Sequence, residues 1–184
     1  MAVFGIGFIL CALASIGARD RPLVARLSAR LGTGAALPCA ICLAVLASSA
    51  LAGWAASLVV PAIVRGLAPV LAAVSLVLGA VQLIALRPRR VPEEPTRSFG
   101  AIFLVLLAGQ AFDPARLAIF GLAVWTGDTV AATLGGVLGS GIALTATADG
   151  RAASNARLWS VLAASVLIAA AGAMAFGARP FLID

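Results

Sequence analysis

Long runs of apolar residues alternate along the chain with short segments that hold most of the charged residues. The apolar runs cover residues 2–17, 34–53, 54–86, 99–112, 117–148 and 158–177. Within the third run, Pro61 and Arg65 mark the end of one helix and a turn before the next. A helix needs about 20 apolar residues to cross a bilayer, so the pattern has room for roughly six crossings. The pattern predicts an all-α integral membrane protein with six transmembrane helices.

The most polar segment, 87–97 (RPRRVPEEPTR), separates two parts of nearly equal length, 1–86 and 98–184. Proline disrupts helices, so this segment is predicted to be a charged cytoplasmic linker. Three helices in each part would place the two parts in opposite orientations in the membrane. The chain is therefore predicted to form two inverted three-helix repeats, an arrangement that recurs in secondary transporters, with the binding site between the repeats.

Composition strengthens the membrane assignment. Of the 184 residues, 62% are hydrophobic and 11% are charged, whereas a soluble domain has about 25% charged residues. A soluble domain of this size cannot bury so much apolar surface, because small domains have a large surface for their volume. An ordinary soluble enzyme, a secreted module and a disordered tail are excluded, and the lipid bilayer is the expected partner.

The 13 basic residues are all arginine, and they are distributed unequally between the two predicted sides of the membrane. Segments 18–32, 87–97 and 149–157 contain ten of them: Arg19, Arg21, Arg26, Arg30, Arg87, Arg89, Arg90, Arg97, Arg151 and Arg157. The other three are Arg65, Arg116 and Arg179. Because arginine-rich loops stay in the cytoplasm, the first group of segments is predicted to be cytoplasmic, in a bacterial inner membrane. No basic face on a soluble domain is available for nucleic acid.

The first apolar run, 2–17, has no basic residue before it, and its first basic neighbours, Arg19 and Arg21, follow it. A cleaved signal peptide carries its positive charges before the apolar stretch. This order predicts a retained first helix with its N-terminus outside the cell.

The chain contains no histidine, and neither a Gly-rich phosphate loop nor a Ser/His/Asp set is present. Without histidine, the usual proton shuttle near neutral pH is missing. We therefore expect no enzymatic activity and no cofactor. Cys39 and Cys42 form a CxxC pair after Pro38, with Cys11 as the other cysteine. Packing as small apolar side chains is favoured over thiol chemistry or soft-metal binding, because a structural zinc site needs four ligands.

Asp113 lies between two apolar runs, in the segment QAFDPAR. An aspartate at the centre of a membrane helix costs about 2.5–3.5 kcal/mol on insertion scales. In one interpretation, Pro114 breaks a membrane helix and Asp113 forms a cation site at the break. In the other, Asp113 and Pro114 form a tight external turn. Arg116 is three residues further on and could pair with Asp113 instead.

Two further segments have a structural interpretation. The segment SIGARDRPLVARLSARLG places Arg26 and Arg30 beside leucines, which favours an amphipathic cytoplasmic helix at the headgroups over a charged helix break facing a cavity. Gly135 and Gly139 are four residues apart, and such small residues allow close helix packing in membranes. Asp128 and Asp149 are expected in loops at helix ends.

The layout and two short motifs resemble the Gdt family of manganese/calcium–proton exchangers, within the lysine-exporter superfamily. Members of that family carry the motif E-x-G-D-[KR]-[ST] early in each half. In this chain LASIGARDR, residues 13–21, stands at the first position, and LAGQAFDPAR, residues 107–116, stands at the second. The similarity continues through GTGAALPCAICLAVL and TGDTVAATLGGVLG.

The resemblance implies a cation antiporter that moves manganese or calcium ions in exchange for protons. Its site would be lined by the motif positions, which are Ser15 and Gly17 in the first copy and Gln110 and Asp113 in the second. Asp113 would be the metal ligand. The chain departs from the motif where Ser15 and Gln110 replace glutamate and Ala18 replaces aspartate, whereas hard divalent ions favour several carboxylates.

Other functions stay open at this point. The chain could be a degenerate relative that does not transport and acts as a membrane partner or scaffold, consistent with the lost acids. It could also be a small-solute exporter of the lysine-exporter superfamily that uses its arginines. A thiol-redox membrane protein is disfavoured, because such proteins have a cysteine in each half and residues 98–184 have none.

Overall fold

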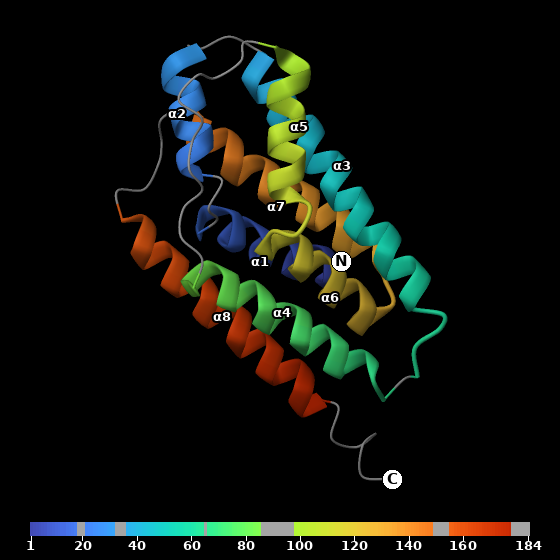
Figure 1. Ribbon diagram of the computed structural model, residues 1–184. Helices are drawn as coiled ribbons and strands as arrows, with labels where there is room; N and C mark the ends of the chain where they lie inside the picture. Colours follow the sequence, from blue (N-terminus) through green and yellow to red (C-terminus); the bar gives the residue numbers. More distant parts are fainter. Residues whose placement is uncertain (18–20, 32–35, 65, 86–97, 149–154, 178–184) are drawn as a thin grey trace.

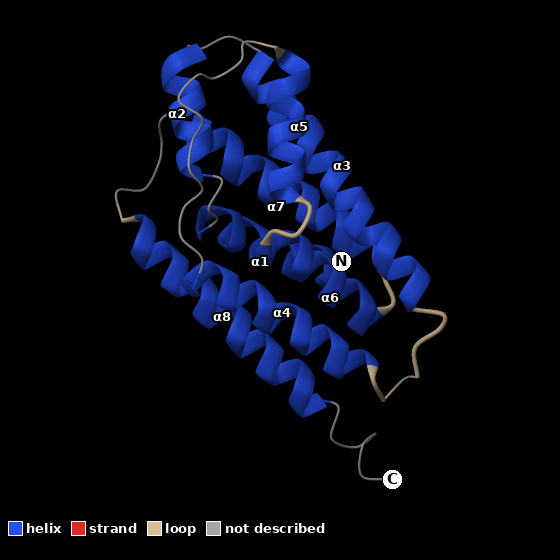
Figure 2. Cartoon of the chain, viewed as in Figure 1, coloured by secondary structure: helices blue, strands red, loops and turns tan. Residues whose placement is uncertain are grey.

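The computed structural model describes residues 1–17, 21–31, 36–64, 66–85, 98–148 and 155–177. These residues form helices α1 (Ala2–Gly17), α2 (Arg21–Leu31), α3 (Ala36–Val59), α4 (Ala68–Ala85), α5 (Phe99–Gln110), α6 (Pro114–Thr126), α7 (Thr129–Ala148) and α8 (Ala156–Gly177). The described part of the chain contains no strand, as Figure 2 shows. The prediction of an all-α protein is confirmed.

Four helices, α3, α4, α7 and α8, are long and apolar enough to cross a membrane. Helices α5 and α6 meet this criterion together, as a pair bent by 55°, and bring the number of candidate crossings to five at most. Helix α1 is apolar but has only 16 residues. By length and composition, the structure therefore supports four or five crossings rather than the predicted six.

The predicted apolar run 117–148 is divided into two helices. Gly127 ends α6 with a φ of 72°, a left-handed conformation that glycine adopts without steric cost, and its N–H donates to Ala123 O at 2.9 Å. Asp128 then caps α7, with its carboxylate accepting from Ala131 N at 3.0 Å. The expectation that Asp128 lies in a loop at a helix end is confirmed, and the single long run is corrected.

The helices run back and forth along one bundle, as Figure 1 shows. Helices α3, α6 and α8 run from the upper left of the view to the lower right, and α1, α4 and α7 run in the opposite direction. Helix α1 packs mainly on α7, and α4 packs on both α6 and α8. Residues of both halves, 1–86 and 98–184, therefore occur together in each of the two hydrophobic core clusters.

Glycines allow α1 and α7 to lie very close together. A Cβ at Gly135 would collide with the carbonyl oxygen of Phe4, and a Cβ at Gly139 would collide with that of Phe8. Without side chains at these two positions, the backbones can touch, as small residues permit in membrane helices. The predicted packing role of both glycines is confirmed. We refer to this contact, Gly135 and Gly139 against Phe4 and Phe8, as the glycine seam.

Helix α2 packs on the upper end of the bundle. Its Leu23, Val24 and Leu27 are buried in one cluster with residues of α3, α5 and α7. The amphipathic helix predicted here is present, and its apolar face is covered by protein. The side chains of Arg26 and Arg30, the predicted linker 87–97 and Asp149 lie outside the described part.

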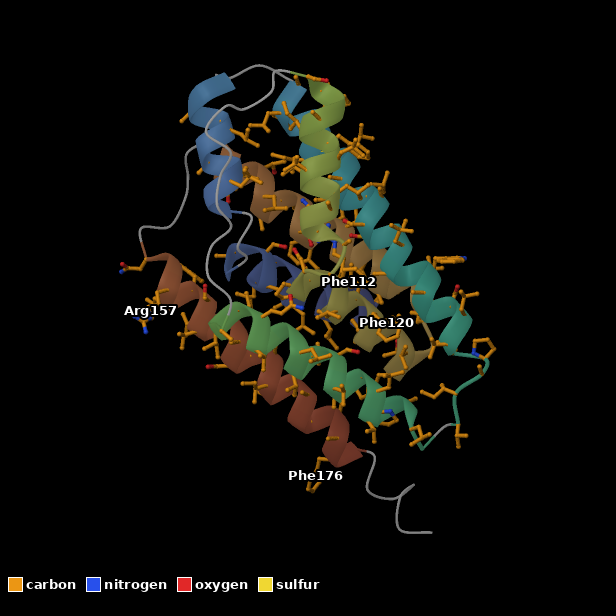
Figure 3. All side chains as sticks on the ribbon, in the orientation of Figure 1. Phe112, Phe120, Arg157 and Phe176 are labelled. Carbon is orange, nitrogen blue, oxygen red and sulfur yellow. The ribbon has the colours of Figure 1, made fainter. Side chains whose placement is uncertain are left out.

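The bundle reverses the usual distribution of polar and apolar side chains. Large apolar side chains point outward along several helices, among them Ile9, Leu46, Leu78, Leu134 and Leu162. Figure 3 shows outward side chains along the bundle, with Arg157 at one end of α8 and Phe176 at the other. Polar side chains, including a charged pair, are buried instead. An outer surface of this kind is suited to lipid, which agrees with the predicted membrane location.

Candidate functional site

The break between α5 and α6 is built by Asp113 and Pro114. Pro114 is the first residue of α6, where its missing N–H costs nothing because that group would have no partner in the helix. Asp113 is the N-cap, and its Oδ1 accepts from the backbone N–H groups of Ala115 and Arg116. This local chemistry starts a new helix at 55° to the previous one and brings Asp113 and Arg116 inside the bundle.

Arg116 lies at the centre of the site, and only 2% of its surface is exposed. Its Nε donates to Ser48 Oγ on α3 at 2.8 Å, and its Nη2 donates to Gln110 Oε1 on α5 at 2.8 Å. Its Nη1 donates to Ser140 Oγ on α7 at 3.2 Å. Nη2 also reaches Ser48 Oγ at 2.7 Å and Val45 O at 3.4 Å. One guanidinium thus joins α3, α5 and α7 to its own helix, α6.

Asp113 supplies the opposite charge. Its Oδ2 lies 3.9 Å from Arg116 Nη1, an ion pair too long for a hydrogen bond, and Asp113 is only 5% exposed. Removing one partner of a buried ion pair costs about 3–5 kcal/mol, because the other charge is left without compensation. Arg116 thus pairs with Asp113, as one of the interpretations of the sequence proposed. The burial of both residues excludes an exposed external turn.

Gln110 is fully buried, and the guanidinium fixes the orientation of its amide. The oxygen must face Arg116, since two N–H groups would repel each other, and it lies 3.2 Å from Ser48 Oγ, whose own hydrogen has a closer acceptor in Ala44 O at 2.6 Å. The amide nitrogen Nε2 then has no hydrogen-bond partner among the described residues. An unmatched buried donor costs about 1–3 kcal/mol, so this group calls for an explanation.

The four site residues predicted from the sequence do not all come together. Asp113 and Gln110 join the same network around Arg116. Gly17 lies elsewhere, against Ser160 and Leu83, and its carbonyl accepts from Ser160 Oγ at 3.0 Å. Ser15 is buried, and its hydroxyl has no hydrogen-bond partner in the described part of the chain. The contacts described for the network include neither Ser15 nor Gly17.

Ser48, Ser140 and the Val45 carbonyl complete the network, and sequence reasoning does not identify them as site residues. Serines are common where membrane helices pack, and Ser140 stands beside the packing glycine Gly139. A usable signal was Arg116 itself, because a buried arginine in a membrane bundle needs several oxygen acceptors nearby.

The three cysteines are separated in the fold. Cys11 on α1 is buried, and its Sγ donates to Ala115 O at 3.4 Å, next to the helix break. Cys39 and Cys42 are exposed near the start of α3. Cys11 packs in the interior as a small apolar side chain. Cys39 and Cys42 do not pack in the interior, so the expectation for the CxxC pair is corrected.

No group of three or more histidine, cysteine, aspartate or glutamate side chains that could hold a metal ion is found in the described ranges. The carboxylate of Asp113 is engaged with the α6 backbone and faces a guanidinium. Of the acids that the sequence offers as metal ligands, Asp113 is the one in the network, and its surroundings are positively charged.

Comparison with protein-family models, with curated proteins and with solved structures finds no match to this chain. Any function therefore has to be argued from the contacts and charges around Arg116.

Proposed function

We propose that the protein is a secondary membrane transporter for a small solute, with its binding site at the break between α5 and α6. The observation on which this rests is the buried Arg116–Asp113 pair with the Gln110 amide, held by α3, α5, α6 and α7. Ionisable residues inside membrane bundles are costly and mark substrate pathways. Transporters place their sites where helices are discontinuous.

The arrangement of helices supports an inverted repeat. The described residues of 1–86 form helices of 16, 11, 24 and 18 residues, and those of 98–184 form helices of 12, 13, 20 and 22 residues. Each half thus has two short helices followed by two long ones. In this proposal α1 is the sixth crossing, because it packs along the membrane-spanning helix α7. The repeat unit then has four helices rather than three.

The proposed orientation places the arginine-rich end in the cytoplasm of a bacterium. The C-terminal ends of α1, α4 and α7 and the N-terminal ends of α3, α5 and α8 lie at the same end of the bundle in Figure 1. Arg157 is exposed at that end. The positive-inside rule assigns such an end to the cytoplasm.

Exchange of manganese or calcium for protons, which the Gdt resemblance implies, is a second candidate. It is favoured by one observation, that two motif positions, Gln110 and Asp113, meet in the network. A small solute is supported better, because a divalent ion needs several oxygen ligands. The available oxygens already accept hydrogen bonds from the positively charged Arg116. A scaffold without transport is the remaining alternative.

Access to the network from both sides of the membrane tests transport without knowledge of the substrate. We suggest Ser140→Cys and Ser48→Cys in a background with Cys11, Cys39 and Cys42 replaced by serine or alanine, in sealed right-side-out and inverted vesicles. A membrane-impermeant maleimide should label the site from both sides, because a transporter exposes its site to each side in turn.

The matched control is Ser165→Cys on the exposed face of α8. If neither network position is labelled from one of the sides while the fold is retained, the protein is a scaffold and transport is refuted. Proteoliposomes loaded for manganese and calcium uptake then separate the two transport candidates. Manganese or calcium flux that is abolished by Asp113→Asn would support the exchanger. If the parent chain carries no such flux, the small solute is supported.

A further inference from the structure

The hydrogen-bonding capacity that the network leaves unused belongs largely to donors. Gln110 Nε2 is buried and has no partner among the residues the structure describes. Arg116 Nη1 has two N–H groups; one donates to Ser140 Oγ, and the other faces Asp113 Oδ2 across 3.9 Å, beyond hydrogen-bond length. Two adjacent side chains thus hold N–H groups that a ligand could use.

The neutral oxygens around the guanidinium are occupied. Ser48 Oγ accepts from Nε and Nη2, Gln110 Oε1 accepts from Nη2, and Ser140 Oγ accepts from Nη1. A cation would have to take these oxygens from Arg116 and would meet its charge. A ligand that accepts hydrogen bonds meets neither obstacle, because arginine and amide N–H groups are donors.

We infer that the solute carries a carboxylate, which binds to Arg116 Nη1 and Gln110 Nε2 at the α5–α6 break. This inference rests on the proposed function and names the chemistry of its substrate. The carboxylate occupies the position beside Nη1 that Asp113 Oδ2 approaches, while Asp113 Oδ1 stays on the α6 backbone. Guanidinium groups bind carboxylates through paired N–H groups, and the N-terminus of α6 adds a favourable partial charge.

The charge of the site favours a monoanion over a dianion. Arg116 and Asp113 balance each other, so a dianion such as phosphate would leave two uncompensated charges in the bundle, and a carboxylate leaves one. In a low dielectric this difference is large, because charge is poorly screened there. Gln110 adds specificity, since its Nε2 has no partner among the described residues and can donate to a hydrogen-bond acceptor but cannot bind a cation.

The test measures ligand binding by the full chain in detergent, through the shift of its thermal unfolding midpoint. The probes are sodium acetate, acetamide as its neutral isostere, inorganic phosphate and manganese chloride, at matched ionic strength. Acetate should raise the midpoint in a concentration-dependent way, because a ligand that binds the folded state stabilises it. Acetamide, phosphate and manganese should give no comparable shift.

Gln110→Glu keeps an oxygen for Arg116 and replaces the free N–H groups with a second oxygen. It should weaken acetate binding by roughly tenfold or more, as expected for loss of a hydrogen bond to a charged group. Gln82→Glu on α4 is the matched control and should bind acetate like the parent chain. Should Gln110→Glu fail to fold, Gln110→Met replaces it, with the same expected loss of acetate binding.

Stabilisation by manganese rather than acetate, by phosphate as strongly as acetate, or by acetate equally in both glutamate variants would overturn the inference. Each of these results can be distinguished from failure of the proposed function. If maleimide reaches Ser140→Cys from both sides but acetate does not bind, the carboxylate assignment alone fails. If acetate binds but the network is sealed from one side, transport alone fails.

Discussion

The network around Arg116 and the glycine seam hold helices together by opposite means. In the network, a guanidinium joins α3, α5 and α7 through oxygen atoms at 2.7–3.2 Å from its nitrogens. In the seam, α1 and α7 touch because Gly135 and Gly139 have no side chains. Helix α7 takes part in both, since Gly139 and Ser140 are neighbours that face different helices.

This contrast separates a packing role from a functional one. The glycine seam brings two backbones into contact and gains stability from close van der Waals packing. The network holds two buried charges and an amide nitrogen with no partner among the described residues, which a bundle built only for stability would replace with apolar side chains. Functional sites are where such costs are tolerated.

The largest effect is expected from Arg116→Met, which breaks the network. The substitution leaves Asp113 buried without its opposite charge and removes the donors that join three helices. The free energy of unfolding should fall by about 3–5 kcal/mol. Denaturant titration in mixed micelles, followed by tryptophan fluorescence, measures this change.

The double variant Arg116→Met/Asp113→Asn serves as the control. Asparagine can still cap α6 and carries no charge, so at least part of the lost stability should return. A double variant that is no more stable than Arg116→Met would show that the ion pair is not the source of the effect.

Gly139→Ala breaks the glycine seam and is expected to have the next largest effect. The added Cβ meets the Phe8 carbonyl oxygen, which cannot move without α1, so stability should fall by about 1–3 kcal/mol. Gly141→Ala is the control on the same helix, because no described atom lies within 4 Å of the site of its Cβ. Equal effects of the two substitutions on the unfolding free energy would argue against close contact.

Ser140→Ala weakens the network while the charge pair stays intact. The substitution removes one acceptor, 3.2 Å from Nη1, so the expected loss of stability is about 1 kcal/mol, typical of a polar contact between membrane helices. Ser165→Ala, on the exposed face of α8, should change stability very little. The same micelle titration compares them, and a larger loss at Ser165 would be inconsistent with the network.

The smallest expected effect is the coupling between the two regions through α7. Gly139→Ala displaces α7 from α1 and thereby shifts Ser140 relative to Arg116. The double variant Gly139→Ala/Ser140→Ala should therefore deviate from additivity by about 0.5 kcal/mol or more. Gly139→Ala combined with Ser165→Ala should be additive, and identical behaviour of both pairs would mean that seam and network are independent.

Much of the fold follows from the positions of apolar residues. The ends of α1, the break between α3 and α4, and the packing role of Gly135 and Gly139 all agree with the sequence pattern. The sequence supports a break at Asp113 and Pro114 as one of two interpretations, and the spacing of three residues allows Arg116 to pair with Asp113, as it does in the structure. These features depend on neighbours in the chain, which a sequence displays directly.

What the sequence could not predict depends on contacts between distant segments. Ser48 is 68 residues from Arg116, and nothing in its surroundings distinguishes it from Ser49. Ser15 and Gly17 stand at positions of the Gdt motif in the first copy, but the motif does not show which way α1 faces in the bundle. The division at Gly127 is indicated only by the expectation that Asp128 lies at a helix end, because apolar residues continue on both sides of it.

Phe112 lies at the break between α5 and α6 (Figure 3), beside Asp113, yet it is 78% exposed. A change in the angle between α5 and α6 would therefore move this exposed ring through the surrounding acyl chains. A fluorinated phenylalanine at this position would report opening of the buried site by its chemical shift without altering any group that contacts Arg116.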